Sequence, residues 1–328
     1  MRSAVFSTAF VFALASSSVQ ATPILNVYTY DSFVSEWGPG PQLKEAFEKQ
    51  CECTLNFIAA EDGVSILNRA RIEKSSTEAD VLLGLDLGLI TEAANLGLVQ
   101  AHSVDTSALK SELDWTNNFF VPFDHGHFAF IYDTRKISEP ASSLEQLISS
   151  NATVIYQDPR TSTPGQGMML WVNAVYGDQA VDAWRRLSTH TETVTKGWWE
   201  AYSLFLEGGA DYVLSYTTSP AYHQVAEGVD HFKAAAFTEG HISQVEVAGI
   251  SAFTQQPDLA NQFIQFMISE EAQSIIPVTN WMLPVIDSVE LPTAFDTLVQ
   301  PETIQISAPD IAAKRKGWIE TWRDAASN

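Results

Sequence analysis

The sequence predicts a two-lobed α/β protein, in which each lobe is a mainly parallel sheet with helices on its faces. Two observations predict this class. First, roughly 300 residues follow an N-terminal leader, which is more than one hydrophobic core usually fills. Second, apolar extended runs at 24–29, 54–59 and 79–83 alternate with helical spacing at 42–51 and 64–72. Strands that alternate with helices in this way become parallel neighbours in a sheet.

Residues 1–21 have the features of a secretory signal peptide. Arg2 provides the positive charge, residues 4–15 form the apolar run, and residues 19–21 (VQA) make a small-residue cleavage site. The run is too short to span a membrane as a helix. We expect cleavage before Thr22 and export to the periplasm; an uncleaved N-terminal anchor is the alternative.

The composition is that of a folded, acidic protein, with 45% hydrophobic and 18% charged residues and a net charge of −22. This charge argues against nucleic acid and anionic membranes as partners, and it is compatible with a cationic ligand or with solubility alone. Export favours a disulfide between the two cysteines, Cys51 and Cys53, which an extended strand would place on one face. No further cysteines are available for a zinc site.

The second half of the chain continues the alternation. Extended runs are expected at 152–156, 193–196 and 212–214, and helices at 168–175, 200–206, 257–267, 270–276 and within 308–326. A long aromatic segment at 118–133 is suited to connect the lobes, and 241–252 is the expected return crossover. We therefore predict a first lobe at 22–119 and 246–285, a second lobe at 120–245, and a C-terminal helical tail at 286–328 that packs on the lobes.

Polar and aromatic residues gather where the expected strands end. Five consecutive hydroxyl residues, 215–219, follow one strand and precede Pro220. Ligands of open α/β sheets bind beyond the carboxyl ends of strands, and a helix that starts there offers free N–H groups to an anion. A Ser/Thr-rich turn that caps the next helix is the alternative for 215–219. Ser162 or Thr163 is placed to cap a helix with Pro164 in its first turn.

The sequence contains no G-x-S-x-G, H-E-x-x-H or phosphate-loop motif. His125 and His127 alternate on one face of an expected strand, a pattern that can bind a metal. Because a third ligand is missing nearby, we expect them instead to be partly exposed residues of the crossover strand, and no metal site is predicted.

Four aromatic residues near the expected strand ends suit either a core or a binding site: Trp198, Tyr216, Tyr222 and Trp281. Each one alone is typical of a hydrophobic core. Together with a carboxylate they favour a site in which aromatic rings stack on a planar cation. The nearby hydroxyl groups would hold an anionic or hydroxyl tail of the same ligand.

The chain resembles the periplasmic thiamine-binding receptors of bacterial ABC importers. The matching segments are VYTYDSF (27–33) with WGPGP (37–41), EDGVSILNR (61–69), YQDPRTSTPG (156–165), TVTKGW (193–198), VLSYTTSPAYH (213–223) and NWM-x-PV (280–285). They follow in order from residue 24 almost to the C-terminus, and jointly they are specific, whereas 99–116 and the tail match less distinctly. The resemblance implies a type II periplasmic-binding fold that holds thiamine, or its mono- and diphosphate, between the lobes. It also implies an ABC permease as partner, a monomer, and no cofactor.

The resemblance further implies the roles of individual residues. Asp62 and Gly63 would contact the vitamin, with Asp62 as counter-charge or pyrimidine partner. The hydroxyethyl or phosphate end would be bound by Ser162, Thr163, Tyr216, Thr217, Thr218 and Ser219. Trp198 would belong to the ligand-binding set, Tyr222 and Trp281 would stack on or enclose the ligand, and Tyr30 and Trp37 would lie at the cleft edge.

Other classes of protein stay open on the sequence alone. A receptor for ferric ion or for a polyamine would use the same fold with tyrosines or acids. A thiamine-degrading enzyme would have a similar two-lobed shape, but it needs a nucleophile in the cleft, generally a cysteine. Cys51 and Cys53 lie between a helix and a strand, at the end opposite the expected cleft. We therefore expect a binding protein without catalytic residues.

Overall fold

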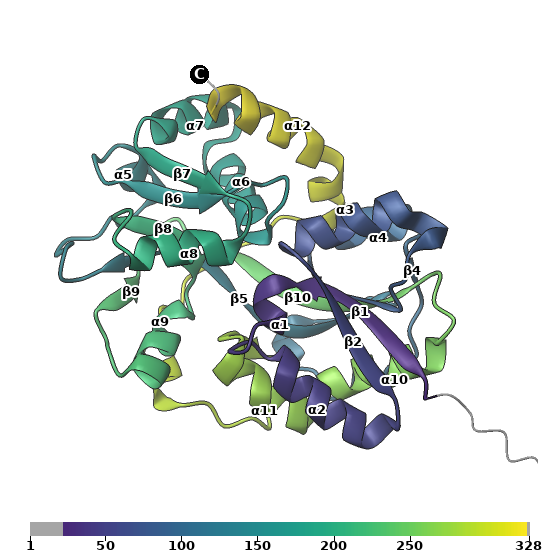
Figure 1. Cartoon of the computed structure of the whole chain (residues 1–328). Coiled ribbons are helices and arrows are strands. Elements are labelled where there is room, and N and C mark those ends of the chain that lie inside the picture. Colours follow the sequence, from purple (N-terminus) through teal and green to yellow (C-terminus); the bar gives the residue numbers. More distant parts are fainter. Residues whose placement is uncertain (1–21, 327–328) are drawn as a thin grey trace, which may run out of the picture.

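A computed structural model describes residues 22–326, and its elements form two lobes (Figure 1). The predicted signal peptide at 1–21 lies outside the described residues. One buried hydrophobic cluster extends from Leu25 to Phe123 and resumes from Val245 to Ile286. A second cluster contains residues between Phe128 and Ile242, together with residues of the C-terminal helix. The two cores confirm the predicted two-lobed α/β fold.

The first lobe is built on three parallel strands in the order β2–β1–β3. These strands are β1 (Ile24–Tyr30), β2 (Thr54–Ala60) and β3 (Val81–Asp86). They are covered by helices, each of which buries one face in the lobe. These helices are α2 (Gly40–Cys51), α3 (Gly63–Glu73), α4 (Ile90–Asn95), α10 (Pro257–Met267) and α11 (Glu270–Thr279). The spacing of apolar residues predicts all of these helices except α4. The short helix α1 (Asp31–Val34) follows β1 directly.

The second lobe repeats this arrangement with parallel strands in the order β8–β6–β7. The strands are β6 (Val154–Gln157), β7 (Thr191–Thr195) and β8 (Tyr212–Tyr216). The helices are α5 (Leu144–Ile148), α6 (Thr163–Tyr176), α7 (Ala180–Ser188), α8 (Trp198–Leu206) and α9 (Ser219–Tyr222), which continues into a π-helical turn (His223–Glu227). Shorter strands complete the sheets: β4 (Val99–Gln100), β9 (Phe232–Ala234), β11 (Leu283–Pro284) and β12 (Thr303–Ile304).

Two long strands cross between the lobes, as predicted. Strand β5 (Phe120–Asp133) pairs antiparallel with β10 (His241–Ser251) through its first half and with β8 through its second half. The pairing with β10 is interrupted by a bulge next to Pro122, because proline has no N–H to donate to the ladder. The strand path β2–β1–β3–β10–β5–β8–β6–β7 therefore runs through both lobes.

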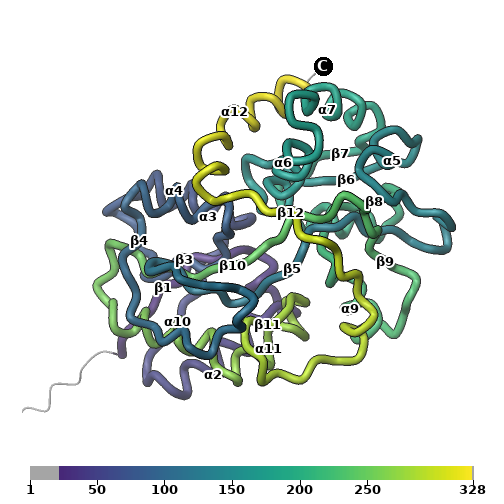
Figure 2. Tube along the Cα trace, turned by 180° about the vertical axis from the view of Figure 1, so that it is seen from behind, coloured from purple at the N-terminus to yellow at the C-terminus, as the bar shows by residue number. Residues whose placement is uncertain are grey.

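The C-terminal segment runs along the back of the molecule from the region of α9 past β12 to α12 (Ala308–Ala326) (Figure 2). Of the three residues predicted to form the apolar face of this helix, Ile311 and Trp322 are buried in the second core and Ile319 packs against it. Arg315 of the same helix donates to Glu92 of α4 at 3.1 Å and to Gln166 of α6. The helix therefore contacts both lobes.

A disulfide joins Cys51 and Cys53, whose Cα atoms are 5.1 Å apart. This confirms the predicted local disulfide, but the extended geometry considered for the pair does not occur. Cys51 ends α2, and Glu52 adopts a left-handed conformation with φ of 50°, so the chain turns between the cysteines and brings them together. Within residues 22–326, no helix is both long and apolar enough to cross a membrane.

Candidate functional site

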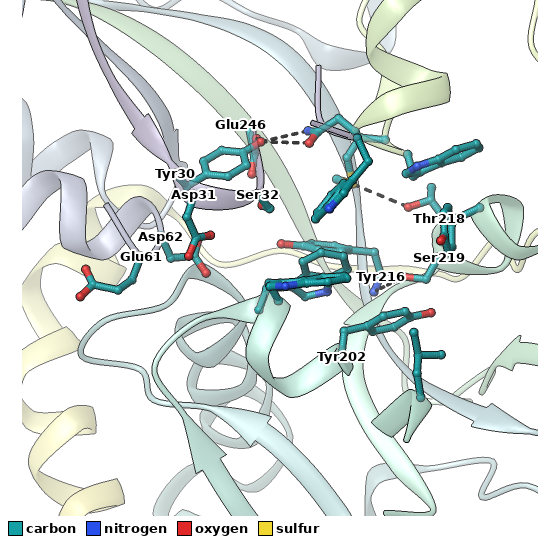
Figure 3. Close-up of a pocket in the computed structure, with 18 residues that line it drawn as sticks. Tyr30, Asp31, Ser32, Glu61, Asp62, Tyr202, Tyr216, Thr218, Ser219 and Glu246 are labelled. Atoms are coloured by element: carbon teal, nitrogen blue, oxygen red, sulfur yellow. Dashed lines mark hydrogen bonds between the residues drawn. The ribbon is translucent and has the colours of Figure 1, made fainter. Parts of the chain in front are cut away.

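A cavity lies between the lobes, at the carboxyl ends of their parallel strands (Figure 3). The first lobe contributes Tyr30, Asp31, Ser32, Trp37, Glu61 and Asp62, and the second lobe contributes Trp198, Trp199, Tyr202, Leu206, Tyr216, Thr218, Ser219 and Tyr222. Glu246 of β10 and the loop residues Asn280, Trp281 and Met282 complete the lining. Sheets of this kind bind ligands at such a position because several loops and helix starts converge there.

The ends of individual strands explain why these side chains meet. Tyr30 is the last residue of β1, Asp62 follows β2 and begins α3, and Tyr216 is the last residue of β8. Trp198 begins α8, which a short turn connects to the end of β7. Because parallel strands of both lobes end at the cavity, residues far apart in the sequence lie around one space.

Aromatic rings form much of the cavity wall. Trp198 stacks on Tyr202, with ring centroids 5.1 Å apart, and its Nε1 donates to Ser215 Oγ at 2.7 Å. Tyr222 and Trp281 meet edge to face, with centroids 5.4 Å apart. Trp281 has a φ of 58°, a conformation that is rare and strained for a bulky side chain, so backbone strain is located at the wall of the cavity.

A contact between tryptophan side chains bridges the two lobes at the outer edge of the cavity. The Trp37 ring of the first lobe lies 4.8 Å from that of Trp199 and 6.4 Å from that of Trp198. Trp37 and Trp199 are both 43% exposed, so they form the outer edge of the cavity. The turn that carries Trp37 requires glycine at 38, because a Cβ there would lie 2.2 Å from the Ser32 carbonyl oxygen.

The acidic side of the cavity is held by a hydrogen-bonded network. Tyr30 OH donates to Glu246 Oε2 at 2.7 Å, and Asn280 Nδ2 donates to Asp124 Oδ2 at 2.7 Å and to Tyr30 OH at 3.0 Å. In Figure 3, Tyr30 and Glu246 lie together on one side, with the carboxylates of Asp31, Glu61 and Asp62 nearby. No lysine, arginine or histidine is among the residues that line the cavity in the described part of the chain.

Burial makes these acids hard to ionise. It raises the pKa of Asp62 to about 6 and the pKa of Asp124 to about 7. Burial, and then the charge of Asp124, raise the pKa of Glu246 well above its usual value. Asp86, at the end of β3, has its pKa raised to about 7 by burial, although Arg315 opposes this shift. The cavity thus offers an environment in which a cation would stabilise the ionised acids.

Nine of the residues singled out by the sequence line the cavity. These are Tyr30, Trp37, Asp62, Trp198, Tyr216, Thr218, Ser219, Tyr222 and Trp281. They come from separate stretches of the chain and from both lobes, so the structure brings them together as a group. Their contact with a ligand stays a prediction.

Gly63, Ser162, Thr163 and Thr217 lie behind the lining. Ser162 occupies the N-cap position of α6, but its hydroxyl does not cap the helix and donates instead to Asp62 Oδ2 at 2.7 Å, across the lobes. The Gly63 N–H donates to the other oxygen of Asp62, and a Cβ on Gly63 would lie 2.3 Å from the Gly84 carbonyl oxygen. Direct contact of Ser162 with a ligand, as predicted, requires the hydrogen bond to Asp62 to open.

The hydroxyl-rich stretch has two kinds of residue. Thr218 and Ser219 face the cavity, opposite the acidic side in Figure 3. Ser219 Oγ also accepts from the Tyr216 N–H at 3.3 Å and shares a hydrogen bond with Ser215 Oγ at 2.8 Å. The Thr217 N–H donates to the His127 carbonyl oxygen at 2.9 Å. The stretch therefore shapes the turn before α9, and it contributes the hydroxyl groups of Thr218 and Ser219 and the phenol of Tyr216 to the cavity lining.

The histidines of β5 belong to the sheet rather than to the cavity. His127 Nε2 contacts Thr303 Oγ1 at 2.8 Å, and burial lowers the pKa of His125 to about 4. Within the described residues, no group of three or more histidine, cysteine, aspartate or glutamate side chains is arranged to hold a metal ion.

Sequence reasoning did not single out several residues that line the cavity, above all Glu246, Asn280, Trp199 and Tyr202. The sequence does contain an indication for Glu246 and for Asp124, which lies opposite it in the sheet. Each is a lone acid within an apolar strand, and a charged side chain is rarely buried there without a partner. For Asn280 and Tyr202 no such signal exists, since a loop asparagine and a helical tyrosine are common in any fold.

Comparison with known proteins places the chain in a family. Residues 38–274 match the family model described as bacterial extracellular solute-binding protein. The chain therefore belongs to this family of solute receptors.

Individual relatives are more specific. The thiamine-binding periplasmic protein of Escherichia coli (strain K12) is 51% identical over 96% of this chain and 97% of its own length. That of Brucella abortus biovar 1 is 47% identical over 98% of this chain and 97% of its own. A solved periplasmic thiamin binding protein superposes with a TM-score of 0.91 at 51% identity, covering 94% of this chain and 97% of that one.

More distant structures share the fold alone. A ferric binding protein from Campylobacter jejuni has a TM-score of 0.78 at 18% identity, and covers 92% of this chain and 99% of that one.

The buried acids predict how stability depends on pH. An acid whose pKa is raised in the folded state stabilises the protein below its unfolded pKa of about 4, and this contribution is lost as pH rises through the folded pKa. Buried histidines such as His125, whose pKa is lowered by burial, have the opposite effect. They make the unfolding free energy rise with pH, but only below their unfolded pKa of about 6.5. We therefore expect the unfolding free energy of the ligand-free protein to fall as pH rises above about 6.5, by at most ~1.4 kcal/mol per pH unit for each acid that is still protonated. Asp86 and Asp124, with pKa values of about 7, and Glu246 are the acids that contribute there.

Urea unfolding at several pH values would measure this decrease. The variant Asp124→Asn should have a flatter profile, because it removes one of the raised acids and the like charge beside Glu246. An unfolding free energy that rises with pH in both proteins would contradict the raised pKa values of these acids.

The tryptophan contact predicts a second outcome. In the double variant Trp37→Ala/Trp199→Ala we expect a larger radius of gyration by small-angle X-ray scattering, because aromatic pairs contribute ~0.5–1.5 kcal/mol each and these pairs hold the lobes together. The exposed Ile72, on α3 and outside the cavity, provides a control as Ile72→Ala. Identical scattering from the double variant and wild type would mean that other contacts keep the lobes closed.

Proposed function

We propose that this protein is a periplasmic receptor that captures thiamine between its lobes and delivers it to an ABC permease. The observation that carries this function is a cavity in which aromatic walls surround buried acids, with no basic side chain among the described residues of its lining. The identity of 45–51% to proteins named thiamine-binding periplasmic protein supports the same ligand.

The chemistry of thiamine fits each part of the cavity. Thiamine has a flat pyrimidine ring and a flat, positively charged thiazolium ring, which aromatic walls such as Tyr222 and Trp281 bind by stacking and cation–π attraction. The acids Asp62 and Glu246 oppose the positive charge, and their burial strengthens the attraction because little water screens it. The hydroxyls of Thr218 and Ser219 suit the hydroxyethyl tail of the ligand.

Thiamine mono- and diphosphate are further proposed ligands. Because the described lining holds no basic side chain, a phosphate would have to be bound by hydroxyl and backbone N–H groups. Ser162 and Thr163 at the start of α6 would take part if the Ser162–Asp62 hydrogen bond opened.

Closure of the two lobes is the proposed signal to the permease. The contacts across the cleft, between Trp37 and Trp199 and between Ser162 and Asp62, exist only when the lobes are together. A ligand that touches both lobes binds the closed form better and so shifts the population toward it. We infer export through the signal peptide at 1–21 and action as a monomer.

The alternatives have weaker support. A cysteine-dependent thiamine-degrading enzyme would need a free thiol at the cavity, whereas both cysteines of the sequence are joined in the disulfide at the end of α2. The alternative of a receptor for ferric ion or a polyamine is supported only by the shared fold and by the acidic residues of the cavity.

Calorimetric titration of refolded mature protein, starting at Thr22, would test the function with thiamine and then with its two phosphates. Refolding matters because protein purified from cells can retain its ligand. We expect tight one-to-one binding of thiamine. If none of the three compounds gives a heat of binding or competes with another ligand, the receptor function proposed here is excluded. The binding of iron and of polyamines would then be measured.

Replacement of the stacking residues gives a sharper test of the site. Tyr222→Ala and Trp281→Ala should each weaken thiamine binding by roughly 1–3 kcal/mol, the scale of aromatic stacking and burial. Phe119→Ala is a matched control, because Phe119 is a 40% exposed aromatic residue outside the cavity. Unchanged affinity in both cavity variants would remove these two residues from the site.

A further inference from the structure

The crossover strands place two acids side by side in the floor of the molecule between the lobes. In the antiparallel ladder, Glu246 of β10 stands directly opposite Asp124 of β5. Asp124 is 0% exposed and Glu246 is 5% exposed. Directly opposed like charges destabilise a sheet, and burial increases this cost because water no longer screens the repulsion.

The hydrogen bonds of the two acids are unequal. Glu246 accepts from Tyr30 OH on one oxygen at 2.7 Å and from Gln244 Nε2 on the other at 3.0 Å. Asp124 accepts from Asn280 on Oδ2 at 2.7 Å, but its buried Oδ1 has no hydrogen-bond partner within the described residues. Glu246 lines the cavity, whereas Asp124 lies behind it. An orphaned oxygen on a buried acid is costly if the acid is ionised.

No cation compensates the pair in the described part of the chain. The titratable groups around it are Tyr30 on β1, Asp62 at the start of α3 and Tyr216 on β8, which are acids or phenols. Asp86 on β3, which also stands opposite Glu246, differs because it accepts from the Gly88 N–H and from Gln166 and lies near Arg315. Two ionised carboxylates in such a place are unfavourable, so one proton remains on the pair near neutral pH.

We propose that Asp124 and Glu246 share a proton while the cavity is empty and release it when a cation enters, so that the pair selects ligands with a permanent positive charge. The step is balanced: one carboxyl O–H bond breaks, its electron pair stays on the carboxylate, and the proton passes to the buffer. The ligand replaces the lost positive charge. Glu246 faces the ligand, and Asp124 acts through Glu246 as a positioning residue. This mechanism rests on the thiamine-receptor function proposed above.

Thiamine fits this selection because its thiazolium charge cannot be lost by deprotonation. A neutral analogue, in which an uncharged aromatic ring replaces the thiazolium, would still stack, but it would lose the cation–π attraction and would leave the proton in place. Such an analogue should therefore bind more weakly and independently of pH. Aromatic stacking alone would not distinguish the two compounds in this way.

The test is calorimetric titration with thiamine near neutral pH, in buffers of different ionisation enthalpy. For wild type we expect the heat to depend on the buffer, with close to one proton released per ligand. The affinity should rise with pH by up to roughly ten-fold per pH unit, because proton release favours binding at higher pH. Measurements are made above the range in which the pyrimidine ring of thiamine itself takes up a proton.

Two isosteric variants separate the roles. Asp124→Asn should release fewer protons per ligand and show a shallower pH dependence, and should bind thiamine more tightly than wild type below neutral pH, since Glu246 then loses the like charge beside it and burial is the main remaining cause that raises its pKa. Glu246→Gln should also release fewer protons per ligand but bind more weakly, since the counter-charge at the cavity is gone. Asp133→Asn is the matched control: it lies buried on the same strand but is paired with Arg135, and should keep wild-type proton release.

A readout without ligand separates this inference from the proposed function. The infrared band of a protonated carboxyl group should be present in the empty wild-type protein at neutral pH and reduced in both variants. Asp86, whose pKa is also about 7, contributes to this band, so the decrease in the two variants is the diagnostic signal. That decrease, found in a protein that does not bind thiamine, would overturn the proposed ligand and leave the shared proton. Thiamine binding with no buffer-dependent heat, or an unchanged infrared band in both variants, would overturn the shared proton.

Discussion

The antiparallel pairing of β5 with β10 holds both lobes in one sheet and supplies the floor of the cavity. Its register places Glu246 opposite Asp124, and the bulge beside Pro122 lies immediately next to this pair. A slip of one residue would turn every side chain of the strand to the opposite face, so the cavity depends on this register being kept. The same strands are the connection about which the lobes would move relative to one another.

The cavity concentrates negative charge that its own described lining does not neutralise. Asp62 and Glu246 face a space walled by tryptophan and tyrosine rings, so the charge is poorly screened by water. In the mechanism proposed above, protons reduce this charge in the empty site and a cation reduces it in the occupied site. Ligand recognition and charge balance would then be coupled.

Much of the fold was predictable because its determinants are local. The apolar run of β1 and the helical spacing of α3 indicate their own structure, and the aromatic length of β5 indicates a crossover. At the site, Trp198 and Tyr216 were predictable because they stand at strand ends. Ser162 was placed correctly at the start of α6, but its hydrogen bond to Asp62 depends on the opposite lobe. Asn280 was not predicted, since a loop asparagine carries no local pattern that indicates a binding site, and Glu246 was missed although it is a lone acid within an apolar strand.

The sequence by itself determined the alternation of strands and helices, the two-lobed class and the kinds of side chain at the strand ends, because these follow from periodicity and from residues close together in the chain. Only the tertiary structure decided which of those side chains share one cavity. It paired Asp124 with Glu246, brought Trp37 against Trp199, and turned Ser162 toward Asp62. These contacts join residues from distant parts of the chain, and their geometry is set by the strand register and by closure of the lobes, which no local pattern encodes.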